Sequence, residues 1–341
     1  MYKFWGLLVL FLISFANCTE RYKDSLFEIE KKTNLVYVQD IPFFAEKHAV
    51  TLLASGLKME SDDVPILHFY QNANNTTNVN LQLDLFLPQK DSAKNRPLVI
   101  MLHGGAFVSG SRDDRSQSII GFCDSLAVRG YVVASIDYRI GLVLKNNGNQ
   151  LLVDSLDFKR AIQWGVQDLQ NAVHYFKIHA DTYGVDPEKF FVIGNSSGAI
   201  LALHFGIENE DSVRGIVSLW GATIDSLRIK NIITPMLLVH GTKDNIIPFT
   251  KGRMLDIDSV RNENRFMPGY ASAASIFNLK FLSPIFFGSF IIDSVLATKH
   301  VAHETFFIEG LGHEIYNREP YKTNILNRIV EFFYKLVMPR F

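Results

Sequence analysis

Short hydrophobic runs alternate with longer amphipathic stretches along the chain from about residue 79. Continuous apolar runs of this kind are typical of strands buried on both faces, and they lie at 97–105, 131–138, 189–194, 215–221, 235–241 and 304–310. Apolar residues at helical spacing between them predict helices within 113–130, 157–180, 197–207, 288–300 and 321–337. This alternation predicts an α/β fold, with a mostly parallel, twisted sheet covered by helices on both faces.

The region before this alternation is less regular. Residues 81–88 alternate between apolar and polar side chains, which predicts an antiparallel strand with one solvated face. Residues 17–78 are mixed, and we expect strands and loops there, at the edge of the fold. Because no Pro/Gly-rich linker or internal repeat divides the chain, we expect one domain over 79–341 beside this N-terminal edge region.

The segment at about 250–287 is longer than a crossover between parallel strands requires. The helix expected at 288–300 supplies that crossover, since about a dozen residues suffice. The surplus is unusually apolar for a loop, with large side chains at Phe266, Met267, Tyr270, Phe277, Phe281, Phe286 and Phe287. We interpret 250–287 as an insertion whose residues 262–287 wall a binding pocket; the alternative is that these side chains pack against the sheet edge.

Residues 1–16 have the layout of a secretory signal peptide. Lys3 precedes an apolar run from Phe4 to Phe15, which ends at a small-residue cleavage site. A membrane span needs about 20 apolar residues, so we expect export to the periplasm, the cell surface or the medium. A retained membrane anchor is the alternative. Cys18 lies at the processing site, where a bacterial lipoprotein would carry its lipid.

Composition narrows the classes of function. The chain has 341 residues, of which 48% are hydrophobic and 20% are charged, with a net charge of −1. Basic residues form no tract, which argues against nucleic acid or an anionic membrane surface as a partner. The two cysteines, Cys18 and Cys123, predict no disulfide, and Cys123 is expected as a core thiol. Residues 300–304, HVAHE, match no zinc-protease motif; we expect a solvated helix end and no metal.

Reactive side chains follow the predicted strands. Ser196 in the stretch GNSSG, then Asp244, then His313 each lie just beyond a buried strand. Because the carboxyl ends of parallel strands meet at one edge of a sheet, these side chains are expected close together. A serine hydroxyl needs a base, which His313 can supply, and a carboxylate such as Asp244 orients the imidazole. The sequence therefore predicts Ser196, Asp244 and His313 as a catalytic triad.

The acid of this triad has alternatives. Asp225 lies one predicted strand earlier, and Asp256 and Asp258 are more distant candidates. Replacing each aspartate by asparagine would separate them. Asp137 also ends a predicted strand, and we expect it to hydrogen-bond to nearby backbone or to Arg139.

Backbone N–H groups near Ser196 are candidates for an oxyanion hole. A tetrahedral intermediate carries negative charge, and the N–H groups of Ser197, Gly105 and Ala106 are expected to face it. Ser197 begins a predicted helix, whose positive dipole end adds to this effect. The glycines two residues before and after Ser196 permit the close backbone approach of a strand–turn–helix bend. His103 is expected to shape the oxyanion loop rather than to transfer protons.

Five stretches together resemble one family: LVIMLHGGAFVSG, VVASIDYR, DPEKFFVIGNSSGAILALH, LLVHGTKDNIIPF and GLGHE. Over about residues 80–335 the chain resembles the α/β-hydrolase superfamily, and within it exported bacterial carboxylesterases with an HGG-type oxyanion motif. Ala106 stands where many relatives have a third glycine.

The resemblance implies the α/β-hydrolase fold, no cofactor, and a carboxylic ester, either a small molecule or attached to a polymer, as substrate. A peptidase or thioesterase of the same fold and a non-catalytic binding protein are the alternatives, because the triad alone does not separate ester from amide cleavage.

Overall fold

A computed structural model describes most of the chain. The described residues are 20–45, 47–51, 66–70, 72–113, 119–148, 150–209, 211–225, 229, 232–255, 279–313 and 318–338. The expected signal peptide at 1–16 and Cys18 lie outside them. Within the described residues, no helix is long and apolar enough to cross a membrane.

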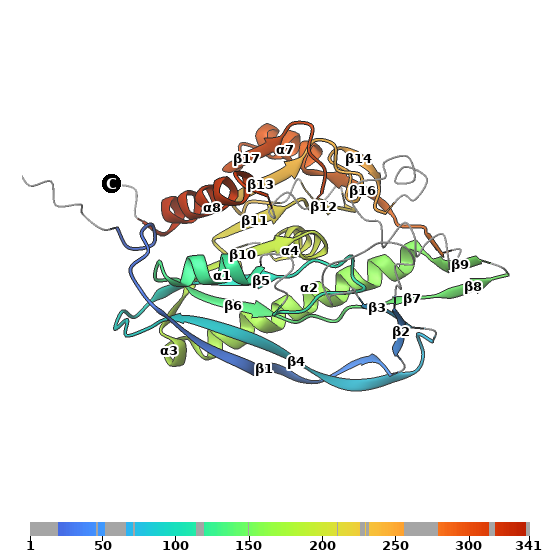
Figure 1. The fold of residues 1–341 in the computed structure, drawn as a ribbon, viewed down its shortest axis with the longest axis horizontal. Helices are drawn as coiled ribbons and strands as arrows, with labels where there is room; N and C mark the ends of the chain where they lie inside the picture. The colour runs from blue at the N-terminus through green and yellow to red at the C-terminus, as the bar shows by residue number, and fades with distance from the viewer. Residues whose placement is uncertain are drawn as a thin grey trace, which may run out of the picture.

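An eight-stranded sheet forms the centre of the molecule (Figure 1). Its strands, in spatial order, are β1 (Ile29–Phe44), β4 (Thr76–Pro88), β6 (Val132–Ile136), β5 (Arg96–Leu102), β10 (Val185–Asn195), β11 (Gly215–Leu219), β13 (Met236–Gly241) and β17 (His303–Ile308). The β1–β4 and β4–β6 pairs are antiparallel, and every pair from β6 to β17 is parallel. The predicted, mostly parallel α/β sheet is therefore confirmed.

Helices cover both faces of this sheet. They are α1 (Ile119–Ala127), α2 (Ser155–Ile178), α3 (Ala180–Tyr183), α4 (Ser197–Glu208), α7 (Ser289–Thr298) and α8 (Tyr321–Val337). Alternate side chains of β5 enter two separate cores: Leu98, Ile100 and Leu102 pack with residues of α2, α4 and α7, whereas Val99 and Met101 pack with residues of α1 and α8. The continuous apolar runs of the parallel strands thus supply both layers of core.

The expectation of a solvated face on residues 81–88 is wrong. Every side chain of β4 from Leu83 to Pro88 is buried. Leu83 and Leu85 face one core, and Phe86 lies in the other beside α1. The polar residue that suggested exposure, Asp84, is only 2% exposed, because cationic side chains cover it. A buried ion pair therefore imitates the pattern of a wet face.

Three small sheets join segments outside the central one. They consist of β12 (Ala222–Thr223) with β16 (Ile285–Gly288) and β14 (Lys251–Arg253), of β15 (Leu279–Phe281) with β9 (Gln150–Val153) and β8 (Lys145–Asn147), and of β2 (Lys47–Thr51) with β3 (Ile66–Tyr70) and β7 (Leu142–Val143).

Two phenylalanines of the predicted insertion, Phe281 and Phe286, are buried in the core. Phe287 is half-buried. Residues 256–278, with the remaining large apolar side chains, lie outside the described residues.

Candidate active site

Ser196 occupies a strained turn between β10 and α4. Its φ of 54° and ψ of −117° lie outside the regions that a residue with a Cβ ordinarily adopts. The Ser196 N–H donates to the carbonyl of Leu219 at 3.0 Å, which ties the turn to β11. A Cβ on Gly194 would lie 2.2 Å from the Gly198 carbonyl oxygen, and one on Gly198 would lie 2.4 Å from that of Leu102. Only glycine fits at both positions.

The structure brings the three predicted catalytic side chains together at the carboxyl edge of the sheet. His313 Nε2 lies 2.9 Å from Ser196 Oγ, and His313 Nδ1 lies 2.6 Å from Asp244 Oδ2. Asp244 is thus the carboxylate on the histidine. Asp225 lies beside Thr223, whose hydroxyl accepts the Asp225 N–H at 3.2 Å. The distant candidates Asp256 and Asp258 lie outside the described residues.

Asp244 is surrounded by hydrogen-bond donors. Its Oδ1 accepts the N–H groups of Ile246 and Ile247 at 2.9 and 3.0 Å. Its Oδ2 faces His313 and, at 3.1 Å, Nε2 of His240. Burial opposes the negative charge, but the charge of His313 and hydrogen bonds from both imidazoles outweigh it, so the pKa of Asp244 lies well below its usual value. The carboxylate stays ionised at neutral pH.

The predicted oxyanion loop has an unusual backbone. Gly105, Ala106 and Phe107 have φ values of 111°, 55° and 64° in succession. The N–H groups of Val108 and Ser109 both donate to the Gly105 carbonyl and close the loop. The third predicted donor, the N–H of Ser197, opens α4 directly after the turn.

Tyr138 links this loop to the serine turn. Its hydroxyl donates to the carbonyl of His103 at 2.8 Å and lies 3.2 Å from Ser197 Oγ. The imidazole of His103 stacks on the Tyr138 ring at 4.3 Å, and its Nδ1 lies 2.7 Å from the Gly104 carbonyl. Burial raises the pKa of Tyr138 well above its usual value, so the phenol remains a donor.

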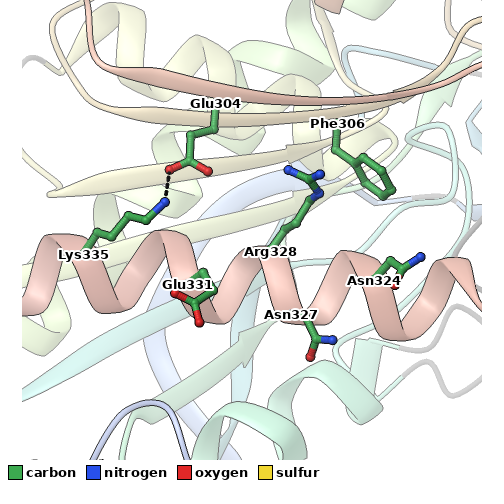
Figure 2. Close-up of a pocket in the computed structure, with 7 residues that line it drawn as sticks. All are labelled: Glu304, Phe306, Asn324, Asn327, Arg328, Glu331 and Lys335. Carbon is green, nitrogen blue, oxygen red and sulfur yellow. Dashed lines mark hydrogen bonds and ion pairs between the residues drawn. The ribbon is translucent and has the colours of Figure 1, made fainter.

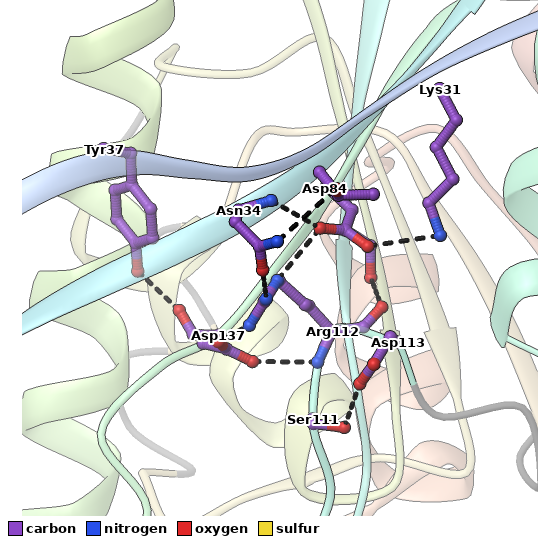
Figure 3. Close-up of polar contacts among 10 residues, drawn as sticks. Lys31, Asn34, Tyr37, Asp84, Ser111, Arg112, Asp113 and Asp137 are labelled. Carbon is purple, nitrogen blue, oxygen red and sulfur yellow. Dashed lines mark hydrogen bonds and ion pairs between the residues drawn. The ribbon is translucent and has the colours of Figure 1, made fainter.

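Of the two partners expected for Asp137, a backbone group is found and Arg139 is not. Asp137 accepts the backbone N–H of Arg112 at 2.9 Å and forms an ion pair with its guanidinium (Figure 3). Arg112 also donates to Asp84 at 3.0 Å. Arg139 pairs instead with the buried Asp168 on α2. The ion-pair cluster in Figure 3 therefore anchors the chain just beyond the oxyanion loop.

Three residues near the site were not predicted from the sequence. They are Tyr138, His240 and Trp220, whose indole N–H donates to the side chain of Asn195, next to Ser196, at 2.7 Å. His240 and Tyr138 lie at or just beyond strand ends, as the predicted residues do. This position in the sequence could have identified both as candidate site residues.

The two histidines of the HVAHE stretch lie in different parts of the fold. His300 follows α7 with a φ of 55°, whereas His303 begins β17 and pairs with Asp293 at 3.0 Å. Only His300 therefore lies at a helix end. Among the residues that the structure describes, no group of three or more His, Cys, Asp or Glu side chains is arranged to hold a metal.

A surface groove of about 500 Å³ lies between β17 and α8 (Figure 2). Its lining includes Lys335, which pairs with Glu304 at 2.9 Å, and Arg328, whose guanidinium lies 4.4 Å from the centre of the Phe306 ring. None of the triad side chains lines it. Both cationic groups thus have partners within the groove.

Comparison with known proteins places this site in context. The family model BD-FAE matches residues 83–233. The neuroligin-like protein glit-1 of Caenorhabditis elegans is 31% identical over 121 residues, 35% of this chain and 15% of that protein. Esterase LipC of Mycobacterium tuberculosis is 24% identical over 237 residues, 55% of this chain and 54% of that protein. The chain thus spans about half the length of LipC, and much less of glit-1.

A solved structure extends the likeness over most of the fold. Thermogutta terrifontis esterase 2, phosphoramylated by tabun, matches with a TM-score of 0.51 and 18% identity, covering 81% of this chain and 97% of that one.

Proposed function

We infer the function of this chain from two findings: it has the α/β-hydrolase fold, and it resembles carboxylesterases in sequence. From this premise we propose that it is a serine carboxylic-ester hydrolase that acts through an acyl-enzyme, with Ser196 as nucleophile, His313 as base and Asp244 as the orienting acid. The observation that carries the proposal is the continuous contact from Ser196 Oγ through His313 to Asp244, at 2.9 and 2.6 Å.

The first half of the reaction acylates the serine. His313 Nε2 removes the Ser196 proton as the hydroxyl attacks the ester carbonyl, and Asp244 stabilises the imidazolium that results. The carbonyl oxygen becomes an oxyanion beside the N–H groups of Ser197, Gly105 and Ala106, each worth about 3 kcal/mol of the barrier in comparable sites. His313 then returns the proton to the leaving alcohol, and the acyl group stays on Ser196.

The second half removes the acyl group by the same steps. Water takes the place of the alcohol, His313 accepts its proton, and a second oxyanion forms at the same donors. Collapse of this intermediate releases the carboxylic acid and restores the Ser196 hydroxyl. No redox step or cofactor enters this sequence, because only proton transfer and acyl transfer occur.

Ester hydrolysis is favoured over amide hydrolysis by the esterases among the relatives. Both small esters and polymer-attached esters fit the proposal. We also propose, on the strength of the sequence pattern, that an N-terminal signal is removed on export: residues 1–16, which leaves an N-terminus at Asn17, or residues 1–17, which leaves a lipidated Cys18. Mass spectrometry of protein from the native host would find Met1 retained if this is wrong.

Labelling with a fluorophosphonate tests the nucleophile. Wild-type protein should be labelled at Ser196 alone, and Ser196→Ala should lower kcat on p-nitrophenyl acetate by about 10⁶-fold. Ser218→Ala is a matched control, because this buried serine on neighbouring β11 has no hydrogen-bond partner for its hydroxyl within the described residues.

p-Nitroanilides and thioesters of the same acyl group test the alternatives. Faster cleavage of either would replace the esterase proposal with a peptidase or a thioesterase. An unlabelled, inactive wild type would indicate a binding protein.

A further inference from the structure

A second histidine lies against the acid of the triad. His240, at the end of β13, is fully buried. Its Nε2 lies 3.1 Å from Asp244 Oδ2 and 3.2 Å from the Ile247 carbonyl oxygen. Its Nδ1 lies 2.8 Å from Ser289 Oγ, at the first residue of α7. The contacts thus run from Ser196 through His313, Asp244 and His240 to Ser289.

These contacts fix which nitrogen of His240 carries the proton. Nε2 faces two oxygens that can only accept, the ionised Asp244 and a carbonyl, so it must be an N–H. In a neutral imidazole Nδ1 is then an acceptor, and the Ser289 hydroxyl donates to it. Ser289 therefore holds His240 in the tautomer that donates to Asp244.

Ser289, His240 and Asp244 repeat the order of a catalytic triad on the opposite side of the shared carboxylate. They do not form a second catalytic centre. Ser289 is fully buried, whereas a nucleophile must meet its substrate. Its Oγ also lies 3.5 Å from the Gly221 carbonyl. The role of His240 must therefore act through Asp244.

We propose that His240 is a positioning residue of the esterase site: its Nε2–H holds Asp244 Oδ2 in place and shares the negative charge that the carboxylate offers to His313. This inference rests on the proposed function. Oδ1 is already fixed by the N–H groups of Ile246 and Ile247. With His240 on Oδ2 the carboxylate cannot turn without breaking a hydrogen bond, and His313 meets an acceptor of fixed direction and reduced basicity.

Four groups from the surrounding elements face the His240 imidazole. They are the Asp244 carboxylate and Ile247 carbonyl of the loop after β13, the Ser289 hydroxyl of α7, and the Phe249 ring at 5.6 Å. His313 lies on the far side of the carboxylate. Removal of the His240 N–H leaves more negative charge on Asp244 Oδ2. This charge stabilises the protonated form of His313, so His313 should lose its proton only at higher pH.

His240→Leu tests this role. It should lower kcat on p-nitrophenyl acetate by about 10- to 100-fold, as loss of one hydrogen bond to a charged group does, with KM nearly unchanged. The acidic limb of the kcat/KM profile should move to higher pH. His240→Gln keeps an N–H near the position of Nε2, so it should recover most of the rate and the original limb.

The rate is expressed per site that fluorophosphonate titrates, so that misfolded protein is not counted. If His240→Leu does not fold, His240→Asn takes its place: the shorter amide is equally polar but does not reach Asp244, and it should show the loss that His240→Gln lacks. His303→Leu is the matched control, because that partly buried histidine on neighbouring β17 pairs with Asp293 and not with the triad. It should keep wild-type kinetics.

Two results would overturn the inference. One is a variant without the N–H whose kcat and acidic limb match the wild type. The other is an equal loss in the Gln, Asn and Leu variants with an unmoved limb, which would make His240 a packing residue. A wild type with neither labelling nor ester hydrolysis would instead overturn the proposed function and leave the geometry around His240 as it is.

Discussion

Asp244→Asn removes the charge of the acid while leaving its shape almost unchanged. In the wild type each carboxylate oxygen receives two donors: Ile246 and Ile247 N–H on Oδ1, and His313 and His240 on Oδ2. An amide has one oxygen and one NH₂ group. Whichever way it turns, the NH₂ group meets two N–H donors. One side of the residue must therefore lose its hydrogen bonds.

The side that can adapt is His313. If the NH₂ group of the asparagine faces this imidazole, Nδ1 accepts and the proton moves to Nε2, beside Ser196 Oγ at 2.9 Å. A protonated Nε2 cannot take the serine proton. The wrong tautomer lowers kcat by about 10⁴-fold in a comparable triad, or ~5.5 kcal/mol of barrier, and we expect a loss of that size here. Steady-state hydrolysis of p-nitrophenyl acetate measures it.

Asp225→Asn is the control for this experiment. It changes the other candidate acid, which hydrogen-bonds beside Thr223, and should leave kcat within about twofold of the wild type. Circular dichroism should show the same fold in both variants. A nearly active Asp244→Asn enzyme with an inactive Asp225→Asn enzyme would refute the reasoning, because the acid would then lie one strand earlier.

Three further predictions concern Gly198, Tyr138 and Tyr70. Gly198→Ala should give insoluble or inactive protein, since its Cβ would lie 2.4 Å from the Leu102 carbonyl oxygen; a soluble, active variant would contradict this steric reading. Tyr138→Phe should lower kcat about tenfold by releasing the His103 carbonyl, with KM nearly unchanged, and an unaltered kcat would disprove the link. Burial raises the pKa of Tyr70 to about 12. Unfolded tyrosines ionise near pH 10, so stability should fall from about pH 10 to 12 in urea melts, less steeply in Tyr70→Phe; equal slopes would count against it.

Hydrophobic periodicity was sufficient to predict the parallel strands of the central sheet. Strands such as β5 and β13 are buried on both faces, so their sequences are continuous apolar runs, and the alternation of strands and helices can be recognised from them. β4 was misread because periodicity records polarity and not burial. Asp84 is polar and buried, paired with Lys31 and Arg112, and both partners are remote in sequence.

In the candidate site, too, residues at strand ends could be predicted, whereas contacts between residues remote in sequence could not. Ser196, Asp244 and His313 could be named because each follows a strand whose end is fixed by the sheet. The partners of Asp137 and His240 could not, because they depend on how loops fold back over that edge. Asp137 meets Arg112, from the loop after β5, and His240 meets Ser289, from a helix that begins 49 residues further along the chain. Sequence spacing carries no record of either contact.

The candidate oxyanion hole has two halves, the Ser196 turn and the loop that contains Ala106 and Phe107, and the backbone of both is strained. Ser196 on one side and Ala106 and Phe107 on the other have positive φ values of 54°, 55° and 64°, and such sparsely populated backbone conformations cost about 1–3 kcal/mol for each residue with a Cβ. Tyr138 contacts both halves, because its hydroxyl reaches the His103 carbonyl and Ser197 Oγ. The ion-pair cluster of Arg112 with Asp84 and Asp137 holds the chain just beyond the oxyanion loop. In the mechanism proposed above, this strained backbone would hold the donor N–H groups in place before substrate arrives, and donors fixed in advance stabilise an oxyanion without reorganisation.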